Sequence, residues 1–140
     1  MKKTSTNLAI AKFIIAAQAA SDAGKDIREI DGRCARHARH DKYACKPGYI
    51  VKAIEIIRNS NSDFRYYVEE KGDQNNYPSV VAYFEFKLDD ERHQVSFHTP
   101  ANRAGVLKKY SNTGRKTRWD GDCGGSRKSC LRLKEYFGIH

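Results

Sequence analysis

Residues 80–88 read VVAYFEFKL, and this stretch decides the fold. Aromatic and β-branched residues dominate it, which favours an extended backbone with two distinct faces. The faces carry Val81, Tyr83 and Glu85 on one side and Ala82, Phe84 and Phe86 on the other. The pattern predicts the strongest strand of the chain.

Two further strands are expected on either side of it. Residues 64–71 are rich in aromatic and β-branched residues, and residues 93–98 return after the polar segment 89–92, which is typical of a hairpin turn. Residues 72–78 are expected to form a polar loop. The sequence therefore predicts a three-stranded antiparallel meander.

An amphipathic helix is expected over residues 8–20, where apolar side chains form a stripe and Lys12 faces water. Thr6 or Asn7 is expected to cap its start and Gly24 to end it. The apolar run is shorter than the ~20 residues that span a bilayer. We therefore expect a cytoplasmic protein with no membrane partner.

Further helices are expected at residues 24–40 and 49–58 before the strands, and at residues 99–110 and 127–137 after them. Thr99-Pro100 and Ser126 are typical residues for helix starts. The fold class is thus α+β, a three-stranded antiparallel meander with N-terminal helices and two short C-terminal helices, packed on one face of the sheet.

The chain is expected to divide into an N-terminal helical region, 1–62, and a small basic α+β domain, 63–140, which together form one compact unit. Its 140 residues are too few for a two-domain enzyme with its own cofactor fold, and no cofactor is expected. The four cysteines leave alternatives open: the disulfides Cys34–Cys45 and Cys123–Cys130 if the protein is exported, or free thiols or ligands in a reducing cytosol.

The chain is basic, with 26 lysines and arginines, 17 aspartates and glutamates, and a formal net charge of +9. The charge is uneven: residues 65–95 carry −3, whereas residues 96–140 carry +7. A basic surface of this kind favours a polyanionic partner, although charge runs are often only a solvated face.

A phosphate site is expected in the basic C-terminal third, where two predicted helices begin after Thr99 and Ser126. Helix starts present unpaired N–H groups and the positive end of the helix dipole. Glycines precede Ser126, but the spacing differs from that of a P-loop. The candidate phosphate or ligand contacts are Arg65, Arg115, Arg118, Trp119, Ser126, Arg127 and Lys128.

The aromatic residues of the three strands have two interpretations. An open sheet face would stack single-stranded RNA or nucleobases, with Arg65 reaching a phosphate. Otherwise these side chains are the core beneath the helices. They are Tyr66, Tyr67, Tyr83, Phe84, Phe86 and Phe97.

Two weaker candidates concern metals. Cys34, His37, His40 and Cys45 are possible zinc ligands, but their spacing matches no standard finger, and a basic helix end explains the segment better. Glu85-Phe86-Lys87 resembles half of a metal-dependent nuclease site. Asp63 or Asp73 would be its second carboxylate, but a solvated strand explains the motif better.

A resemblance adds to these interpretations. The segments RYY at 65–67, VSFHTP at 95–100, TRWD at 117–120 and GSR at 125–127 look like small accessory proteins of bacterial viruses. Among these, residues 64–140 are similar to the Thoeris anti-defence sponges, which sequester cyclic ADP-ribose-type and cyclic oligonucleotide signals. The resemblance implies a non-catalytic homo-oligomer in the host cytoplasm. Its ligand contacts would be Arg65, Phe97, Arg118 and Arg127.

The expected function is therefore non-enzymatic sequestration of nucleotide signals, or nucleic-acid binding, in counter-defence. One alternative is an inhibitor that docks on a host defence nuclease or a CRISPR complex. The other is a metal-dependent nuclease.

Overall fold

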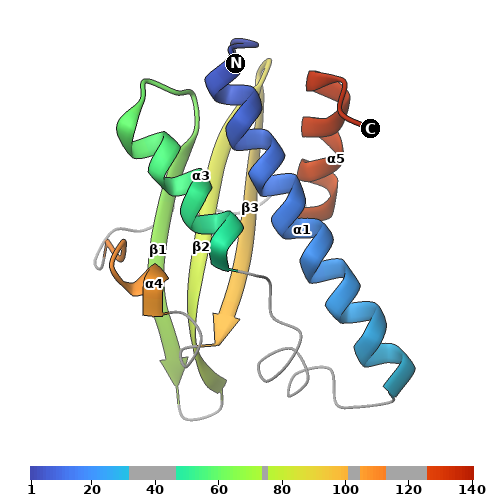
Figure 1. Ribbon diagram of the computed structural model, residues 1–140, viewed down its shortest axis with the longest axis vertical. Coiled ribbons are helices and arrows are strands. Elements are labelled where there is room, and N and C mark those ends of the chain that lie inside the picture. The colour runs from blue at the N-terminus through green and yellow to red at the C-terminus, as the bar shows by residue number, and fades with distance from the viewer. Residues whose placement is uncertain (32–46, 74–75, 101–104, 113–125) are drawn as a thin grey trace.

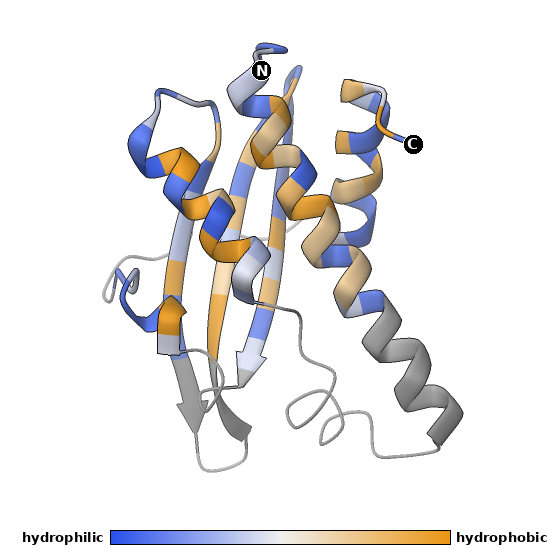
Figure 2. Ribbon diagram, viewed as in Figure 1, coloured by the Kyte–Doolittle hydropathy of each residue, from blue (hydrophilic) through white to orange (hydrophobic). Residues whose placement is uncertain are grey.

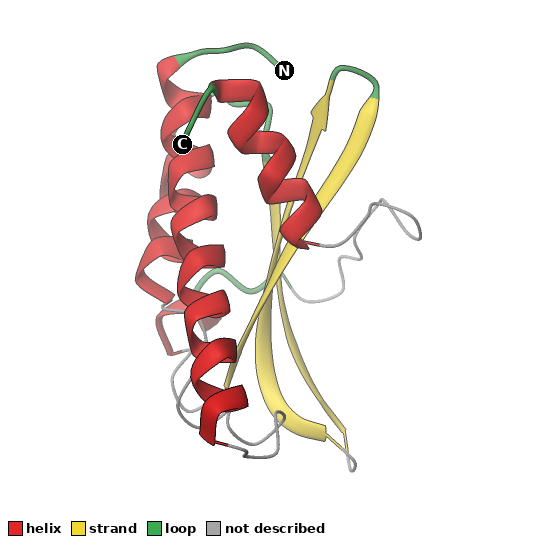
Figure 3. Ribbon diagram, turned by 90° about the vertical axis from the view of Figure 1, so that its right-hand side faces the viewer, coloured by secondary structure: helices red, strands yellow, loops and turns green. Residues whose placement is uncertain are grey.

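The computed structural model describes residues 1–31, 47–73, 76–100, 105–112 and 126–140 (Figure 1). Within these residues, helices cover one face of a small antiparallel sheet (Figure 3). The expected α+β class is confirmed, as is the placement of the helices on a single face.

The sheet consists of β1 (Arg65–Asp73), β2 (Asn76–Leu88) and β3 (Glu91–Pro100), in the order β1-β2-β3. This is the expected meander, with longer strands. Residues 76–78, which were expected in a loop, belong to β2. The hairpin turn is only Asp89-Asp90, since Leu88 already pairs with Glu91. Asp89 takes a left-handed φ of 55°, which Asp tolerates better than most residues.

The helices are α1 (Ser5–Asp31), α3 (Pro47–Asn59), the single turn α4 (Gly105–Lys108) and α5 (Ser126–Phe137). Hydrophobic and hydrophilic residues are interleaved along α1 and α3 (Figure 2), as amphipathic packing requires. No helix among the described residues is both long and apolar enough to cross a membrane.

The core lies between the helices and the sheet. Ala82, Phe84 and Phe86 of β2 are at most 1 % exposed and pack in one cluster with Ile10, Ile14, Ile50, Ile54 and Leu133. The predicted two faces of β2 are therefore confirmed. The cluster joins residues from both expected regions, 1–62 and 63–140.

The first helix differs from the prediction at both ends. Thr4 caps it, since its Oγ1 accepts a hydrogen bond of 3.1 Å from the Asn7 N–H. The helix continues through Gly24 to Asp31. The prediction of a separate helix that begins at Gly24 is therefore wrong. A lone glycine costs a helix roughly 1 kcal/mol but removes no hydrogen bond, which is a weak stop. The rest of the expected second helix, 32–40, lies outside the described residues.

The expected helix start at Thr99-Pro100 is also wrong. Both residues belong to β3, where Thr99 pairs with Val80 and Pro100 with Ser79. Because β3 is an edge strand, a proline without an N–H group is tolerated there. Only Gly105–Lys108 of the expected helix over 99–110 is helical among the described residues.

The outer edge of β1 is closed at Val68. The Asn112 N–H donates to the Val68 carbonyl at 3.0 Å, and the Val68 N–H donates to the Asn112 Oδ1 at 2.7 Å. Residues 112 and 126 flank the segment 113–125. Asn112 contacts β1 and Ser126 contacts β3, so these two residues lie at opposite edges of the sheet.

Candidate anion-binding site and the buried histidine network

Several predicted site residues lie outside the described part of the chain. They are Arg115, Arg118 and Trp119 of the basic segment, and the possible zinc ligands Cys34, His37, His40 and Cys45. Among the residues that are described, no three His, Cys, Asp or Glu side chains gather in a way that would hold a metal ion.

Phe97 is a core residue. It is 2 % exposed, and its ring packs edge-on against Phe84 at 6.0 Å. Phe86 is also buried, and Tyr67 is fully buried on the opposite face of the sheet. The core interpretation therefore holds for Phe84, Phe86 and Phe97, and a ligand contact by Phe97 stays a prediction.

Arg65 lies apart from the other described candidates. It sits on β1, and its Nη2 donates a hydrogen bond of 2.9 Å to the Tyr67 hydroxyl. Ser126 and Arg127 belong to α5, which contacts β3 at the far edge of the sheet. Two strand spacings of ~4.8 Å separate these edges, so Arg65 does not join α5 in one small pocket.

Ser126 anchors the start of α5 to the sheet. Its Oγ accepts a hydrogen bond of 3.0 Å from the Ser96 N–H of β3. The hydroxyl oxygen therefore serves the fold, and α5 begins where the sequence predicts. The next residues, Arg127 and Lys128, are exposed.

Arg127 already holds a carboxylate of its own chain. Its Nε donates to the Asp22 Oδ1 at 2.9 Å, and the Gln18 Nε2 of α1 donates to the same oxygen at 3.1 Å. The Arg127 side chain is 58 % exposed and that of Asp22 is 38 % exposed. Two converging donors on one oxygen are the arrangement that recognises an anion.

A cavity of about 190 Å³ lies beside this ion pair, between α1 and α5. Its polar residues include the cations Arg127 and Lys134, which are two helical turns apart. Leu131 lies between them and is 57 % exposed. The lining residues are Ile15, Gln18, Ala19, Asp22, Arg127, Cys130, Leu131 and Lys134.

Cys130 lines this cavity, and its thiol is free and buried. The alternative of a Cys123–Cys130 disulfide is therefore not realised. Burial raises the pKa of Cys130 to about 12, so the thiol stays protonated near neutral pH.

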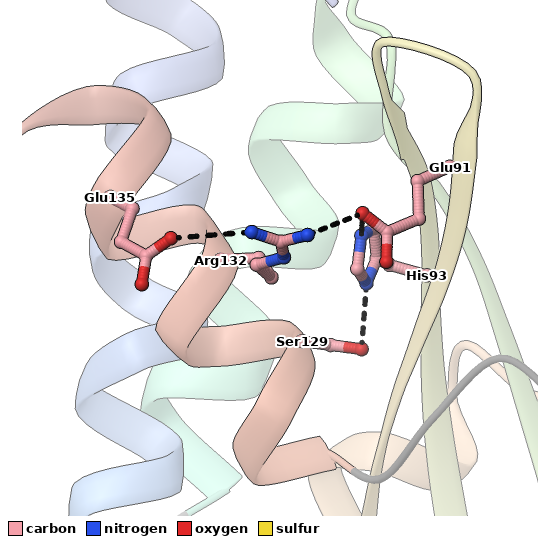
Figure 4. A network of polar contacts seen from close by, with 5 residues as sticks. All are labelled: Glu91, His93, Ser129, Arg132 and Glu135. Carbon is pink, nitrogen blue, oxygen red and sulfur yellow. Dashed lines mark hydrogen bonds and ion pairs between the residues drawn. The ribbon is translucent and has the colours of Figure 1, made fainter.

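A second polar cluster, which the sequence did not reveal, joins β3 to α5 (Figure 4). The His93 Nδ1 lies 3.1 Å from the Ser129 Oγ, and its Nε2 lies 3.5 Å from the Glu91 Oε2. Arg132 contacts the same Glu91 oxygen at 3.2 Å and the Glu135 carboxylate at 3.5 Å. We call these five residues the His93 network.

The His93 network contains the residue types of a serine nucleophile, a histidine and an acid, but its geometry does not suit catalysis. Ser129 is 0 % exposed and His93 is 1 % exposed, so no substrate reaches the hydroxyl. A catalytic nucleophile must lie within hydrogen-bond distance of its base, and the reacting atom of the substrate must be able to reach it. The network is therefore a buried contact between two elements.

His93 and His98 are five residues apart on β3 and so lie on opposite faces: His93 is buried and His98 is exposed. The alternation that carries Val95 and Phe97 into the core also carries His93 there. That alternation was the available signal for a buried histidine.

Glu85 was expected on a solvated strand, and this expectation is wrong. It is 0 % exposed and accepts a hydrogen bond of 3.2 Å from the Gln94 Nε2. Lys87 of the same motif is exposed. Asp63 is one of the two residues considered as the second carboxylate of this motif. It accepts hydrogen bonds from Asn7 and from the Lys2 N–H, and these bonds lower the pKa of Asp63.

Comparisons with protein-family models, with curated proteins and with solved structures found no match for this chain.

Proposed function

We propose that the protein is a non-enzymatic binder of polyanions, either nucleic acid or a nucleotide, and that the start of α5 is part of its contact surface. The observation that carries the proposal is the placement of Arg127 and Gln18 on one carboxylate oxygen of Asp22. A phosphate oxygen has the same acceptor chemistry as that carboxylate and accepts guanidinium donors equally well. Lys128 adds an exposed cation one residue further along.

Exchange of Asp22 for a ligand phosphate is energetically accessible. Exposed ion pairs contribute little to stability because water and salt screen them. A ligand that brings several phosphates gains several contacts at once, including counterion release. Arg127 is therefore held in a conformation suited to anions, at low cost to the fold when Asp22 is displaced.

The sequence supports the same assignment. The segments outside the described residues contain nine of the 26 lysines and arginines but only three of the 17 acidic residues. They include Arg115 and Arg118, which come shortly before α5 in the chain. We propose that these arginines act with Arg127, and that the ligands include the cyclic nucleotide signals of a counter-defence role.

Binding of a labelled single-stranded RNA and of a cyclic dinucleotide, measured at several salt concentrations, tests the proposal. Arg127→Gln and Lys128→Gln are expected to weaken binding and to lower the slope of log affinity against log salt by about 0.7 per lost phosphate contact. Lys109→Gln removes an equal charge from an exposed position directly after α4 and is the matched control.

Equal losses in all three variants would show a general charge effect and would overturn the assignment to α5. Cleavage of either ligand would overturn the non-enzymatic proposal. Absence of binding to both ligands, with capture of a protein complex instead, would favour the inhibitor alternative.

A further inference from the structure

A buried histidine joins α5 to the sheet, beside the apolar packing of Cys130 and Leu133 in the core. The polar contacts between α5 and β3 include Ser126 with the Ser96 N–H, Ser129 with His93, and Arg132 with Glu91. Of these, only the His93 contact is fully buried on both sides. We propose that His93 is a proton-sensitive latch, which holds α5 on the sheet while the imidazole is neutral and loosens it when the imidazole is protonated.

The contacts of the imidazole favour one neutral form. With the proton on Nε2, the ring N–H faces the Glu91 carboxylate, and Nδ1 accepts a hydrogen bond from the Ser129 hydroxyl. With the proton on Nδ1, the lone pair of Nε2 would face the Glu91 carboxylate. The first form pairs Nδ1 with Ser129 and turns the Nε2 proton toward Glu91, although Nε2, at 3.5 Å from the Glu91 Oε2, has no hydrogen-bond partner among the described residues.

Protonation adds a charge where the surroundings oppose it. Burial of the ring is the largest opposing effect, and Arg132 and Lys128 on α5 add positive charge nearby. Glu91 on β3 favours the charged form, but it shares its Oε2 with Arg132. On the β2 side, Phe86 stacks on the ring at 5.3 Å and brings no charge. The net result is a His93 pKa below its usual value of 6.5.

The direction of the pH effect follows from this depressed pKa. An undocked α5 exposes His93 to water, where its pKa returns to about 6.5. Protons therefore bind more readily to the undocked state, and docking is full above pH ~6.5 and weakens as the pH falls through the pKa of the docked state. Between these two pKa values, the population of undocked α5 rises by up to about tenfold per pH unit.

The charged neighbours allow the latch to be tuned in opposite directions. Arg132→Gln removes an opposing cation and leaves Glu91 to the histidine, so the His93 pKa should rise. Glu91→Gln removes the favourable carboxylate, so the His93 pKa should fall. Both side chains are about half exposed, and these variants should fold. Lys134→Gln removes a cation of α5 that is not among the charges acting on His93 and is the matched control.

The experiment measures two quantities between pH 7.5 and 5.2. Carbon-detected NMR reports the titration of the His93 ring. Hydrogen exchange, corrected for intrinsic rates, reports the opening of α5 against that of α3. Opening of α5, but not of α3, is expected to increase below pH ~6.5, and His93→Gln is expected to abolish the pH dependence.

A pH-independent α5, or an equal pH dependence in His93→Gln, would overturn the latch. It would also be overturned if Arg132→Gln and Glu91→Gln moved the His93 titration in the same direction, or if Lys134→Gln moved it as far. Loss of the Arg132 ion pair changes docking at every pH, so the pH dependence, and not the absolute exchange rate, is the deciding readout. None of these measurements requires a ligand.

Discussion

Asn7 and Asp63, which are 56 residues apart, hold each other through two hydrogen bonds. The Asn7 Nδ2 donates to the Asp63 Oδ2 at 2.8 Å, and the Asp63 N–H donates to the Asn7 Oδ1 at 3.3 Å. Asn7 is 1 % exposed. The pair fixes the first turn of α1 to the segment that enters β1, and so joins the N-terminal helix to the sheet.

Removal of the Asn7 side chain should destabilise the protein. Asn7→Ala leaves the Asp63 N–H without its partner, and a lost buried hydrogen bond of this kind costs roughly 1–3 kcal/mol. Urea unfolding of the wild type and the variant measures the difference. Asn61→Ala, at an exposed position after α3, is the control and should change the unfolding free energy by less than about 0.5 kcal/mol. Equal effects would contradict the prediction.

The same region should make the protein acid-sensitive. Hydrogen bonds from the Lys2 N–H and from Asn7 lower the pKa of Asp63 below 3.8. A depressed carboxyl pKa contributes stability that is present above the unfolded pKa and is lost as the pH falls through the folded pKa. Asp63→Asn should therefore flatten the loss of stability below pH ~4. Urea unfolding at several pH values measures this, and the same loss of unfolding free energy below pH ~4 in Asp63→Asn and the wild type would contradict the prediction.

Two apolar residues should respond very differently to truncation. Phe84 is 0 % exposed in the core, and Leu131 is 57 % exposed on α5. Phe84→Ala should cost about 3–5 kcal/mol because it removes buried surface and leaves a cavity. Leu131→Ala should change stability by less than about 0.5 kcal/mol. Thermal or urea unfolding measures both, and a large cost for Leu131 would place it in an unrecognised contact.

Cys130 should resist alkylation in the folded protein. Its pKa of about 12 leaves almost no thiolate at pH 8, and the side chain is buried. Iodoacetamide treatment followed by peptide mapping should find Cys130 unmodified before unfolding and modified in urea. Fast modification of the native protein would show that the start of α5 opens readily at this pH.

Asp22 should act as an internal competitor of an anionic ligand. Asp22→Asn removes the carboxylate charge on Arg127 and should tighten RNA binding by about two- to fivefold, the equivalent of one exposed ion pair. Asp90→Asn changes the net charge equally at the exposed hairpin turn and is the control. Fluorescence anisotropy at 0.1 M salt measures both, and an equal gain in the two variants would contradict a local competition.

The sheet was predictable because its signal is local. In residues 80–88 each side chain takes its face from the strand period alone, and Ala82, Phe84 and Phe86 lie in the core as predicted. Thr99-Pro100 was misread because its helix-start chemistry is local, whereas the pairing of Thr99 with Val80 that overrides it is not. Gly24 was misread because a single glycine is only a weak stop.

The site was predictable in part. Arg127 was identified from its position at a helix start, but its partner Asp22 is 105 residues away in the chain. The burial of Glu85 and the contact of His93 with Ser129 depend on which elements pack together. Charge and periodicity in the sequence specify neither of these packing arrangements.

The closure of β1 at Val68 limits how copies of this chain can assemble. A strand offered by a second molecule would have to displace Asn112 and break both of its bonds to the Val68 backbone before it could extend the sheet at that edge. Asn112, with the Ser111 hydroxyl that also donates to the Val68 carbonyl, thus acts as a plug against sheet growth there. A homo-oligomer, if formed, would have to use a different surface or first remove this plug.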